Sequence, residues 1–469
     1  MQRDLTPIQS FYKGKNIFIT GATGVCGRIL LEKILRSLLD IGTIFLIIRS
    51  KRDLNGAQRI QKLLQTPLFK LNPPKKSQVQ KIVVIEGDVT DGGLSMSSED
   101  ELRLINSVDI IFHVAASTFK SLLNYRENFN SNVVGTENVL EFAKKVKNLK
   151  CFVHVSTAYS NCQLSCIDET LYPLSSNVHT MVEKFKSLDD KNLEIEGVKH
   201  FDGRPNNYTF TKAIAEHVVH SYFPSLPVVI ARPAVVIPAA KEPAPGFFDT
   251  LEGPTGLAIV ASLGILKVWD WDLNNRYENY PVDYLANSLI AIAYDSQKKS
   301  KEMKIFNLVA SPLNDYDNDY DAIKSGREYW LTRPSIYTLR YPIMPDRICT
   351  MSNTEYKIKR FFYHTVFAFF LDLILMILGR KRMMMRVVRK MHSALDVMKY
   401  FSNKQWTFKC ENYKKLIDEL DAKDEEIFSI DISKVNFTQL YQDSSRIARK
   451  MILHEDESNI PIAKMKLKM

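Results

Sequence analysis

A glycine-rich stretch near the N-terminus constrains this chain more than any other feature. It reads Thr-Gly-Ala-Thr-Gly-Val-Cys-Gly at residues 20–27, with three glycines at a spacing of three. The β-branched and aromatic run at 16–19 predicts a buried strand before it, and the amphipathic pattern of 28–35 predicts a helix after it. Strand, glycine turn and helix in this order form the layout that holds the pyrophosphate of a dinucleotide.

Each glycine has a separate role in that layout. Gly21 permits the tight turn, Gly24 lets the backbone come close to the phosphates, and Gly27 lets the helix pack on the strand. Thr23 and Val25 lie in the same loop and are assigned to the cofactor with it. The N–H groups and the dipole of the following helix attract the anion. A plain turn has the same local sequence, so the rest of the chain has to decide.

Basic residues follow the second predicted strand. The apolar run at 43–48 predicts that strand, and Arg49, Ser50, Lys51 and Arg52 come directly after it. Dinucleotide folds that prefer NAD often have an acidic residue here, which binds the ribose 2′-hydroxyl. Because Arg49 and Arg52 would attract a 2′-phosphate, the sequence predicts NADPH as the cofactor. An ordinary solvated basic loop is the alternative.

Strand-like and helix-like runs alternate over the next 180 residues or so. Further strands are expected at 82–86, 108–114, 151–155 and 227–231, and helices at 54–68, 98–106, 132–145 and 208–223. This alternation predicts an α/β fold, a Rossmann-like doubly wound parallel sheet with helices on both faces. Residues at the carboxyl ends of two strands are assigned to the cofactor as well; they are Asp88, Val89, Ala115 and Ala116.

A tyrosine and a lysine four residues apart open the predicted helix at 208–223. Tyr208 and Lys212 therefore lie on one face of it. We expect the lysine ammonium to lower the pKa of the tyrosine and to bind the nicotinamide ribose. Ser156 and Thr157, at the end of the strand at 151–155, can bind a carbonyl oxygen. Together these four residues predict a catalytic site for carbonyl reduction, with tyrosine as the proton donor.

Composition and the C-terminal third point to a lipid surface or an anionic ligand. The net charge is +10, and no nucleic-acid motif accompanies it. Cys162 and Cys166 resemble half of a zinc site, but no second pair is apparent, so no metal is predicted. Residues 361–378 are mostly apolar, and six basic residues follow at 380–390. A transmembrane helix, a monotopic segment or hairpin, and a buried soluble helix remain open for 361–378.

The ensemble of glycine turn, strand-end hydroxyls and Tyr-x-x-x-Lys resembles the extended short-chain dehydrogenase/reductases. Several stretches narrow the resemblance to the alcohol-forming fatty acyl-CoA reductases, particularly the insect type. The most specific are Glu-Pro-Ala-Pro-Gly-Phe-Phe-Asp-Thr-Leu-Glu-Gly-Pro-Thr-Gly at 242–256 and Pro-Val-Asp at 281–283. Trp-Thr-Phe at 406–408 continues the similarity into the C-terminal third. Lys267 departs from the family pattern, which has an arginine in that region, so contact with the CoA phosphates is in doubt there.

The resemblance implies a complete activity. A long-chain fatty acyl-CoA would be reduced by two NADPH to a primary alcohol through a thiohemiacetal and an aldehyde, with release of CoA. It also assigns Asn132 to the cofactor site as a structural and proton-relay residue. It implies a reductase domain at 1–300, a connecting segment at 301–355 and a helical domain at 356–455.

The resemblance further implies an intracellular membrane, peroxisomal or of the endoplasmic reticulum, with the catalytic domain facing the cytosol. A homo-oligomer is left open. Two rival functions remain at this point. One is another extended reductase that acts on a sterol or a nucleotide sugar, and the other is a dinucleotide-binding scaffold without turnover.

Overall fold

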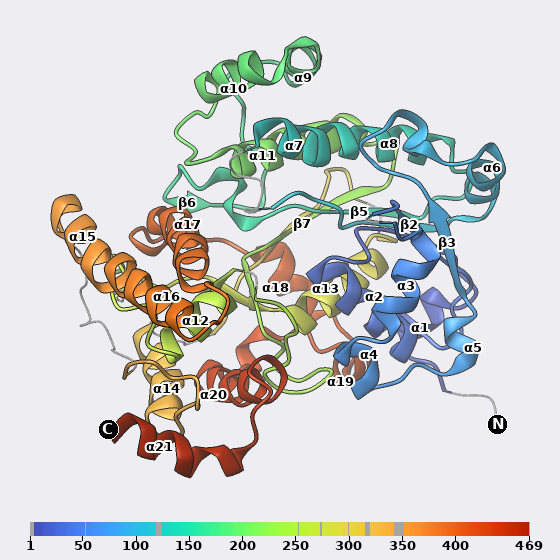
Figure 1. Ribbon diagram of the computed structural model, residues 1–469. Helices are drawn as coiled ribbons and strands as arrows, with labels where there is room; N and C mark the ends of the chain where they lie inside the picture. Colours follow the sequence, from blue (N-terminus) through green and yellow to red (C-terminus); the bar gives the residue numbers. More distant parts are fainter. Residues whose placement is uncertain are drawn as a thin grey trace. The chain divides into compact units, whose positions relative to one another are not determined.

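The chain forms two compact units that interleave along the sequence. The computed structural model describes residues 4–51, 53–118, 124–251, 253–272, 274–298, 300–314, 319–341 and 351–468 (Figure 1). Unit 1 comprises Met1–Val236, Asn279–Leu313 and Trp406–Ser433, and unit 2 comprises Ile237–Glu278, Asn314–Gln405 and Lys434–Met469. Each unit thus combines segments that are distant in the sequence. The division into three consecutive domains, at 1–300, 301–355 and 356–455, stays a prediction.

Unit 1 is built on a seven-stranded parallel sheet with the order β10-β7-β5-β4-β1-β2-β3. The strands are β1 (Ile17–Thr20), β2 (Ile44–Ile48), β3 (Ile82–Glu86), β4 (Ile110–His113), β5 (Cys151–Val155), β7 (Val228–Pro233) and β10 (Ile305–Leu308). The order along the sheet reverses between β1 and β4. In sheets of this kind the ligand crevice lies outside the carboxyl ends of the strands at that reversal. The predicted doubly wound α/β fold is therefore confirmed.

Helices cover both faces of this sheet (Figure 1). On one face, Phe18, Ile111 and Phe152 of the strands join a buried apolar cluster with Leu140 and Ile214. The helices that carry the last two are α8 (Gly135–Lys145) and α11 (Asn207–Ser221). The helices α2 (Val25–Ser37) and α13 (Val282–Asp295) pack together on the opposite face. Because both faces are covered, most strand residues are apolar, as their sequences predicted; His113, His154 and Arg232 are among the buried polar exceptions.

Shorter elements complete unit 1. They are α1 (Pro7–Tyr12), α3 (Gly56–Leu64), α4 (Pro67–Leu71), α5 (Lys76–Val79), α6 (Ser98–Ser107), α7 (Tyr125–Phe129), α9 (Val178–Ser187), α10 (Asp190–Lys199), α18 (Glu411–Asp418) and α19 (Ala422–Ile427), with β6 (Cys166–Ile167), β8 (Val235–Ile237), β9 (Asn279–Pro281) and β11 (Thr407–Phe408). The β6–β11 pair joins the segment at 406–433 to the rest of the unit. No strand or helix was predicted from the sequence where β6, α9 and α10 lie.

Six strands lie within two residues of their predicted positions, and the seventh was not predicted. β10 is a four-residue strand inside the predicted connecting segment, and its run Ile-Phe-Asn-Leu is interrupted by a polar residue. The predicted helix at 132–145 begins earlier than expected, as a π-helical turn at Asn130–Val134 that continues into α8.

Unit 2 is mainly helical. Its helices are α12 (Pro254–Ser262), α14 (Asp319–Thr332), α15 (Asn353–Arg360), α16 (Phe367–Ile377), α17 (Met384–Ser402), α20 (Phe437–Ile447) and α21 (Ile460–Lys468). A π-helical stretch, Phe361–Val366, joins α15 to α16, so Asn353–Ile377 is one continuous helix. By length and composition this helix is able to cross a membrane, and only 17% of its most apolar window is buried.

Candidate active site

The glycine loop between β1 and α2 has the geometry that its spacing predicted. Gly21 has a φ of +74°, and a Cβ there would lie 2.6 Å from the backbone nitrogen of Ala115. A Cβ at Gly27 would lie 2.2 Å from the carbonyl oxygen of Gly21. A side chain at either position would therefore clash with backbone. Gly24 is the N-cap of α2 and provides no side-chain cap, so the N–H groups of the first turn, which begins at Val25, remain for an anion.

Two arginines lie beside this loop at the carboxyl end of β2, and only one of them was predicted. Arg59 from α3 donates to the Thr23 hydroxyl at 3.1 Å and to the Arg49 carbonyl oxygen at 2.7 Å. Arg49 lies 3.4 Å from the Asp88 carboxylate. Arg52 lies outside the described residues. Arg59 comes ten residues after Arg49, and the only sequence signal for it is its position in the first turn of the next helix.

The remaining predicted cofactor residues lie at the ends of β3 and β4. The Asp88 carboxylate accepts hydrogen bonds from the backbone N–H and the hydroxyl of Thr90, both at 3.0 Å, which holds the turn after β3. The next carbonyl, of Val89, accepts from Asn138 at 2.9 Å. Ala115 follows β4, and its N–H donates to the Thr20 hydroxyl at 3.1 Å. In the loop after β4, Ala115 is half-buried and Ala116 is exposed.

A neutral histidine that the sequence did not single out fixes the end of β4. His113 is fully buried, and burial, together with the charge of Lys212, lowers its pKa to about 3. Its Nδ1 lies 2.8 Å from the Thr20 hydroxyl, and its Nε2 lies 3.0 Å from the Thr136 hydroxyl. Because Thr136 donates to the Asn132 carbonyl at 2.6 Å, it accepts from the imidazole Nε2–H. One chain of hydrogen bonds thus links β1, β4 and the helix that carries Asn132.

Asn132 is held between the loop after β4 and α11. Its side-chain oxygen accepts from the Ser117 N–H at 2.8 Å, and its amide nitrogen donates to the Ser117 carbonyl at 3.1 Å. The same nitrogen lies 3.0 Å from the Thr211 hydroxyl. Asn132 therefore ties Ser117 to Thr211, one residue from Lys212. The structural and proton-relay role that the resemblance implied for Asn132 stays a prediction.

Tyr208 and Thr157 meet at the N-terminal end of α11. Their hydroxyls form a hydrogen bond, and Thr157 also accepts from the Tyr159 N–H at 3.3 Å. Burial raises the pKa of Tyr208, the neighbouring Cys26 adds to the rise, and Thr157 opposes it. Because burial dominates, this pKa lies above its ordinary value and not below it, which corrects the expected net direction. The phenol is protonated at neutral pH, which suits a proton donor.

Lys212 lies one turn along α11 and is buried. Its ammonium donates to the Val155 carbonyl oxygen at 2.6 Å. Burial lowers its pKa to about 8, and Glu216 opposes the change. The lysine is thus anchored on the last residue of β5, immediately before the two hydroxyls assigned to the site. Of the predicted catalytic set, the structure brings Tyr208 and Thr157 into contact and fixes Lys212 one helical turn away.

Ser156 has a different partner from its neighbour. Its hydroxyl donates to the buried Glu216 carboxylate at 2.6 Å, and Ser160 donates to the same oxygen at 3.1 Å. Arg232 donates to both oxygens of Glu216, at 2.9 and 2.8 Å. Although burial opposes it, Arg232 and the two hydroxyls lower the pKa of Glu216. The sequence signals for this pair were the spacing of Glu216 from Lys212 and the Ala-Arg-Pro at the end of β7.

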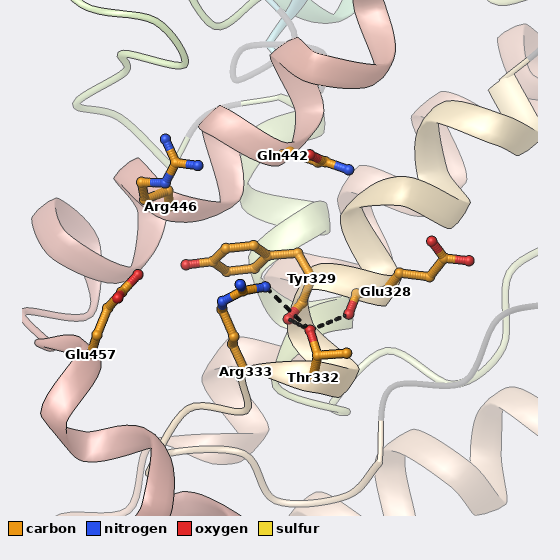
Figure 2. A pocket seen from close by; sticks show the side chains of 7 residues that line it. All are labelled: Glu328, Tyr329, Thr332, Arg333, Gln442, Arg446 and Glu457. Atoms are coloured by element: carbon orange, nitrogen blue, oxygen red, sulfur yellow. Dashed lines mark hydrogen bonds between the residues drawn. The ribbon is translucent and has the colours of Figure 1, made fainter.

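A cavity in the described part of unit 2 contains none of the predicted site residues. It has a volume of about 240 Å³ and lies between α14, α20 and the turn at 457–459 (Figure 2). Its lining residues are Glu328, Tyr329, Thr332, Arg333, Gln442, Arg446 and Glu457. Two arginines and two glutamates leave it without a net charge. Lys267, also in unit 2, donates from its ammonium to the Tyr341 carbonyl oxygen, so the ammonium has a partner within the protein.

Comparison with known proteins agrees with this geometry. Two family models, both described as male sterility protein, match residues 19–289 and 363–455, and the first is an NAD-binding model. The fatty acyl-CoA reductase wat of Drosophila melanogaster is 35% identical over 98% of this chain and 88% of its own length. Fatty acyl-CoA reductase 1 of Homo sapiens is 31% identical over 99% of this chain and 89% of its own length.

Two solved structures share the fold at low identity. The terminal R domain from the myxalamid PKS-NRPS biosynthetic pathway has a TM-score of 0.64 and 18% identity, covering 94% of this chain and 92% of that domain. The reductase domain of a non-ribosomal peptide synthetase from Mycobacterium tuberculosis has a TM-score of 0.62 and 16% identity, covering 96% and 97%. The glycine loop, the parallel sheet and identities above 30% along almost the whole sequence agree, and the chain belongs to the fatty acyl-CoA reductase family.

Proposed function

We propose that this protein reduces a long-chain fatty acyl-CoA to a primary alcohol with NADPH. The observation that carries the proposal is the hydrogen bond between Tyr208 and Thr157, with Lys212 anchored one turn away. This arrangement offers a proton donor and a hydroxyl to one carbonyl oxygen. The names of the relatives support a fatty acyl-CoA as the source of that carbonyl.

NADPH, rather than NADH, is favoured by the charge around Thr23. The glycine loop suits a nicotinamide dinucleotide, because it follows a strand, precedes a helix and excludes side chains at Gly21 and Gly27. Arg49 and Arg59 lie beside the loop, where the fold has the adenosine ribose. Charge-assisted hydrogen bonds from guanidinium groups bind a 2′-phosphate, whereas no carboxylate stands directly after β2 for a free 2′-hydroxyl.

Thr157 and Tyr208 bind and protonate the carbonyl oxygen in both reduction steps. The bound cofactor supplies a hydride to the carbonyl carbon. In the first step Thr157 holds the thioester oxygen and Tyr208 gives it a proton, which produces a thiohemiacetal. Tyr208 then takes that proton back as the carbon–sulfur bond breaks, so an aldehyde forms and the CoA thiolate leaves and is protonated by solvent. A second hydride and the proton of Tyr208 then give the alcohol, and solvent returns a proton to the tyrosinate.

In the proposed mechanism Lys212 and Asn132 support these steps but do not contact the reacting carbon. The ammonium of Lys212 stabilises the tyrosinate that forms each time Tyr208 gives up its proton. Asn132 fixes the backbone of Ser117 and the Thr211 hydroxyl, and thereby the start of α11. Ser156 acts through Glu216, which holds it away from the carbonyl, so we assign the substrate oxygen to Thr157 alone.

A substrate panel separates this function from its rivals. Purified protein is incubated with NADPH and, in separate reactions, with acyl-CoAs from short to very long, a keto-sterol and a nucleotide sugar. The proposal expects a fatty alcohol from the long acyl-CoAs and consumption of two NADPH per alcohol. Turnover of only the sterol or the sugar would establish another extended reductase. NADPH binding without any product would establish a scaffold.

We also propose an intracellular membrane as the location, that of the peroxisome or of the endoplasmic reticulum, with the reductase unit facing the cytosol. The apolar helix Asn353–Ile377 and the lipid character of the substrate support it. Fractionation of cells that express the tagged chain, with marker proteins for both organelles, tests it. Recovery with neither set of membranes contradicts the proposal.

A further inference from the structure

The helix Asn353–Ile377 has an inverted distribution of polar and apolar side chains. Its buried residues are separated by multiples of four, and they are Tyr356, His364, Ala368 and Asp372. Large apolar side chains are exposed instead, among them Phe362 (61%), Phe369 (58%), Phe370 (56%) and Ile377 (75%). A helix at a protein–water boundary has the opposite pattern. The exposed side of this helix is therefore suited to an apolar environment.

The buried carboxylate locks the helix into a hairpin. Asp372 accepts three backbone hydrogen bonds from the start of α17, from Met383 and Met384 at 2.8 Å and from Met385 at 2.9 Å. α17 consequently turns back along α16 instead of continuing away from it. Asp372 acts as the N-terminal cap that α17 lacks in its own N-cap residue, Met383.

A second buried contact fixes the base of the hairpin. His364 Nε2 accepts from the backbone N–H groups of Lys267 and Val268, at 2.9 and 3.2 Å. Its Nδ1 lies 3.1 Å from Nε2 of His392 on α17. The buried polar groups of His364 and Asp372 are thus satisfied within unit 2. The exposed apolar side chains take no part in these buried contacts.

Basic side chains surround the turn of the hairpin. Three of them follow one another in the turn itself and three lie on α17, and all are exposed: Arg380, Lys381, Arg382, Arg386, Arg389 and Lys390. Ile377 and Leu378, the latter 64% exposed, immediately precede them. The apolar and the cationic groups therefore meet at one end of the hairpin, which is the combination that binds anionic lipid headgroups.

We propose that this hairpin surface lies in the plane of an anionic lipid bilayer and does not span it. The hairpin surface is defined by the exposed apolar residues of 361–378 and the six basic residues of 380–390. The apolar side chains enter the boundary between headgroups and acyl chains, while the arginines and lysines contact lipid phosphates. The inference is independent of the proposed catalytic activity.

The fold of the hairpin argues against a span. A spanning α16 would carry Arg380, Lys381 and Arg382 through the hydrocarbon core. Because Asp372 holds the start of α17 beside α16, Arg386 and Arg389 would also lie at membrane depth. Charged side chains at that depth are strongly disfavoured when they face lipid. In-plane binding leaves all of these charges at the headgroups.

Vesicle flotation with the full-length protein tests the proposal. Phosphatidylcholine vesicles are compared with vesicles that also contain phosphatidylserine, and tighter binding to the second kind is expected. Replacing all three basic residues of the turn (Arg380→Gln, Lys381→Gln, Arg382→Gln) should weaken binding to the anionic vesicles about fivefold per charge. Phe369→Gln with Ile377→Gln should reduce binding to both kinds.

Matched variants control for charge and for exposed apolar area. Lys70→Gln, Lys75→Gln and Lys76→Gln remove three exposed charges of unit 1, and Leu102→Gln with Ile195→Gln removes two exposed apolar side chains there. Neither set should change vesicle binding. All of the substituted side chains are exposed, so unchanged melting curves are expected throughout.

Three results would overturn the proposal. The first is a wild-type protein that fails to float with anionic vesicles, or hairpin variants that bind as well as the controls. The second is an Ile377→Trp variant whose emission is quenched more by lipids brominated near the chain terminus than by lipids brominated near the headgroup, which would indicate a span. The third is self-association that the apolar variant abolishes while vesicle binding is absent, which would make the surface an interface between copies.

Discussion

Ser156 and Thr157 are neighbours in the sequence, yet only Thr157 bonds to Tyr208. We expect Thr157→Val to lower kcat/KM about a hundredfold, because a donor to the developing oxyanion is lost. Ser156→Ala should lower it less than about tenfold, since it removes one of several hydrogen bonds to Glu216. Steady-state kinetics with a long acyl-CoA measures both. Equal losses in the two variants would contradict the assignment.

Arg59 is expected to determine the preference for NADPH together with Arg49. Arg59→Ala should raise Kd for NADPH about tenfold to a hundredfold and leave Kd for NADH nearly unchanged, because only NADPH has the 2′-phosphate. Lys62→Ala, an exposed cation on the same helix, is the matched control. Titration of cofactor fluorescence gives all of these constants. A parallel loss of both cofactors would show a structural role for Arg59 instead.

The charge of Lys212 should make kcat/KM decrease at alkaline pH. Its pKa is lowered to about 8 by burial, so the ammonium is present below that pH and is lost above it. Because the ammonium stabilises the tyrosinate, kcat/KM should be constant in the neutral range and fall as pH rises through about 8. A pH profile of the wild-type enzyme measures this. A flat profile up to about pH 10 would exclude a catalytic requirement for the lysine charge.

The sequence predicts the residues of the site that belong to local patterns and misses those that depend on the tertiary fold. Gly21, Gly27 and the pair Tyr208/Lys212 have fixed spacings within one turn or one helix, so they are visible in the chain. Arg59 and Glu216 act on residues that the fold brings to them from other elements. Burial raises the pKa of Tyr208, and the extent of burial is not visible in a Tyr-x-x-x-Lys spacing.

At the scale of elements, Asp372 is expected to hold α17 against α16. Asp372→Ala should destabilise the hairpin by about 1–2 kcal/mol, the usual cost of losing an N-terminal cap. Amide hydrogen exchange at Met383, Met384 and Met385 should accelerate, because these three N–H groups lose their acceptor. Asp418→Ala, at an exposed position of α18, is the control. Unchanged exchange at the three methionines would contradict the cap.

Long periodic elements were predicted well, and short or irregular ones were not. β2 is a continuous apolar run, β5 is apolar except for His154, and both lie where expected. β10 is short and contains Asn307, whose side chain donates to the Lys409 carbonyl at 2.8 Å. That partner lies 102 residues away, so nothing near β10 in the sequence explains the polar residue. The apolar run at 361–378 was visible in the sequence as well. The three hydrogen bonds that Asp372 accepts from backbone N–H groups depend on the tertiary fold, so they were not.

At the scale of the molecule, unit 1 depends on a segment from the C-terminal third. Glu169 accepts backbone hydrogen bonds from Asn307 at 2.8 Å and from Asn412 at 2.5 Å. The Trp406 indole donates to the Cys162 carbonyl at 2.9 Å, and the Tyr413 hydroxyl contacts that of Tyr280. The segment at 406–433 therefore completes the unit that carries the glycine loop.

A truncated chain tests this dependence. A chain that ends at residue 405 should lose NADPH binding and unfold at a lower temperature than the full chain, although it keeps every predicted cofactor and catalytic residue. Ending the chain at residue 459 instead removes all of α21, which belongs to unit 2, and should leave NADPH binding intact. Thermal melting with and without NADPH measures both. Full stability of the chain that ends at residue 405 would contradict the division into two interleaved units.

Deuterium transfer tests the central claim most directly, namely that one site reduces the thioester carbon twice. The protein is incubated with a long-chain acyl-CoA and NADPH that carries deuterium at the transferred position, and the alcohol is analysed by mass spectrometry. The account predicts two deuterium atoms on carbon 1 of the alcohol, and no alcohol from Tyr208→Phe although that variant still binds NADPH. An alcohol with a single deuterium, or full activity in Tyr208→Phe, would contradict it.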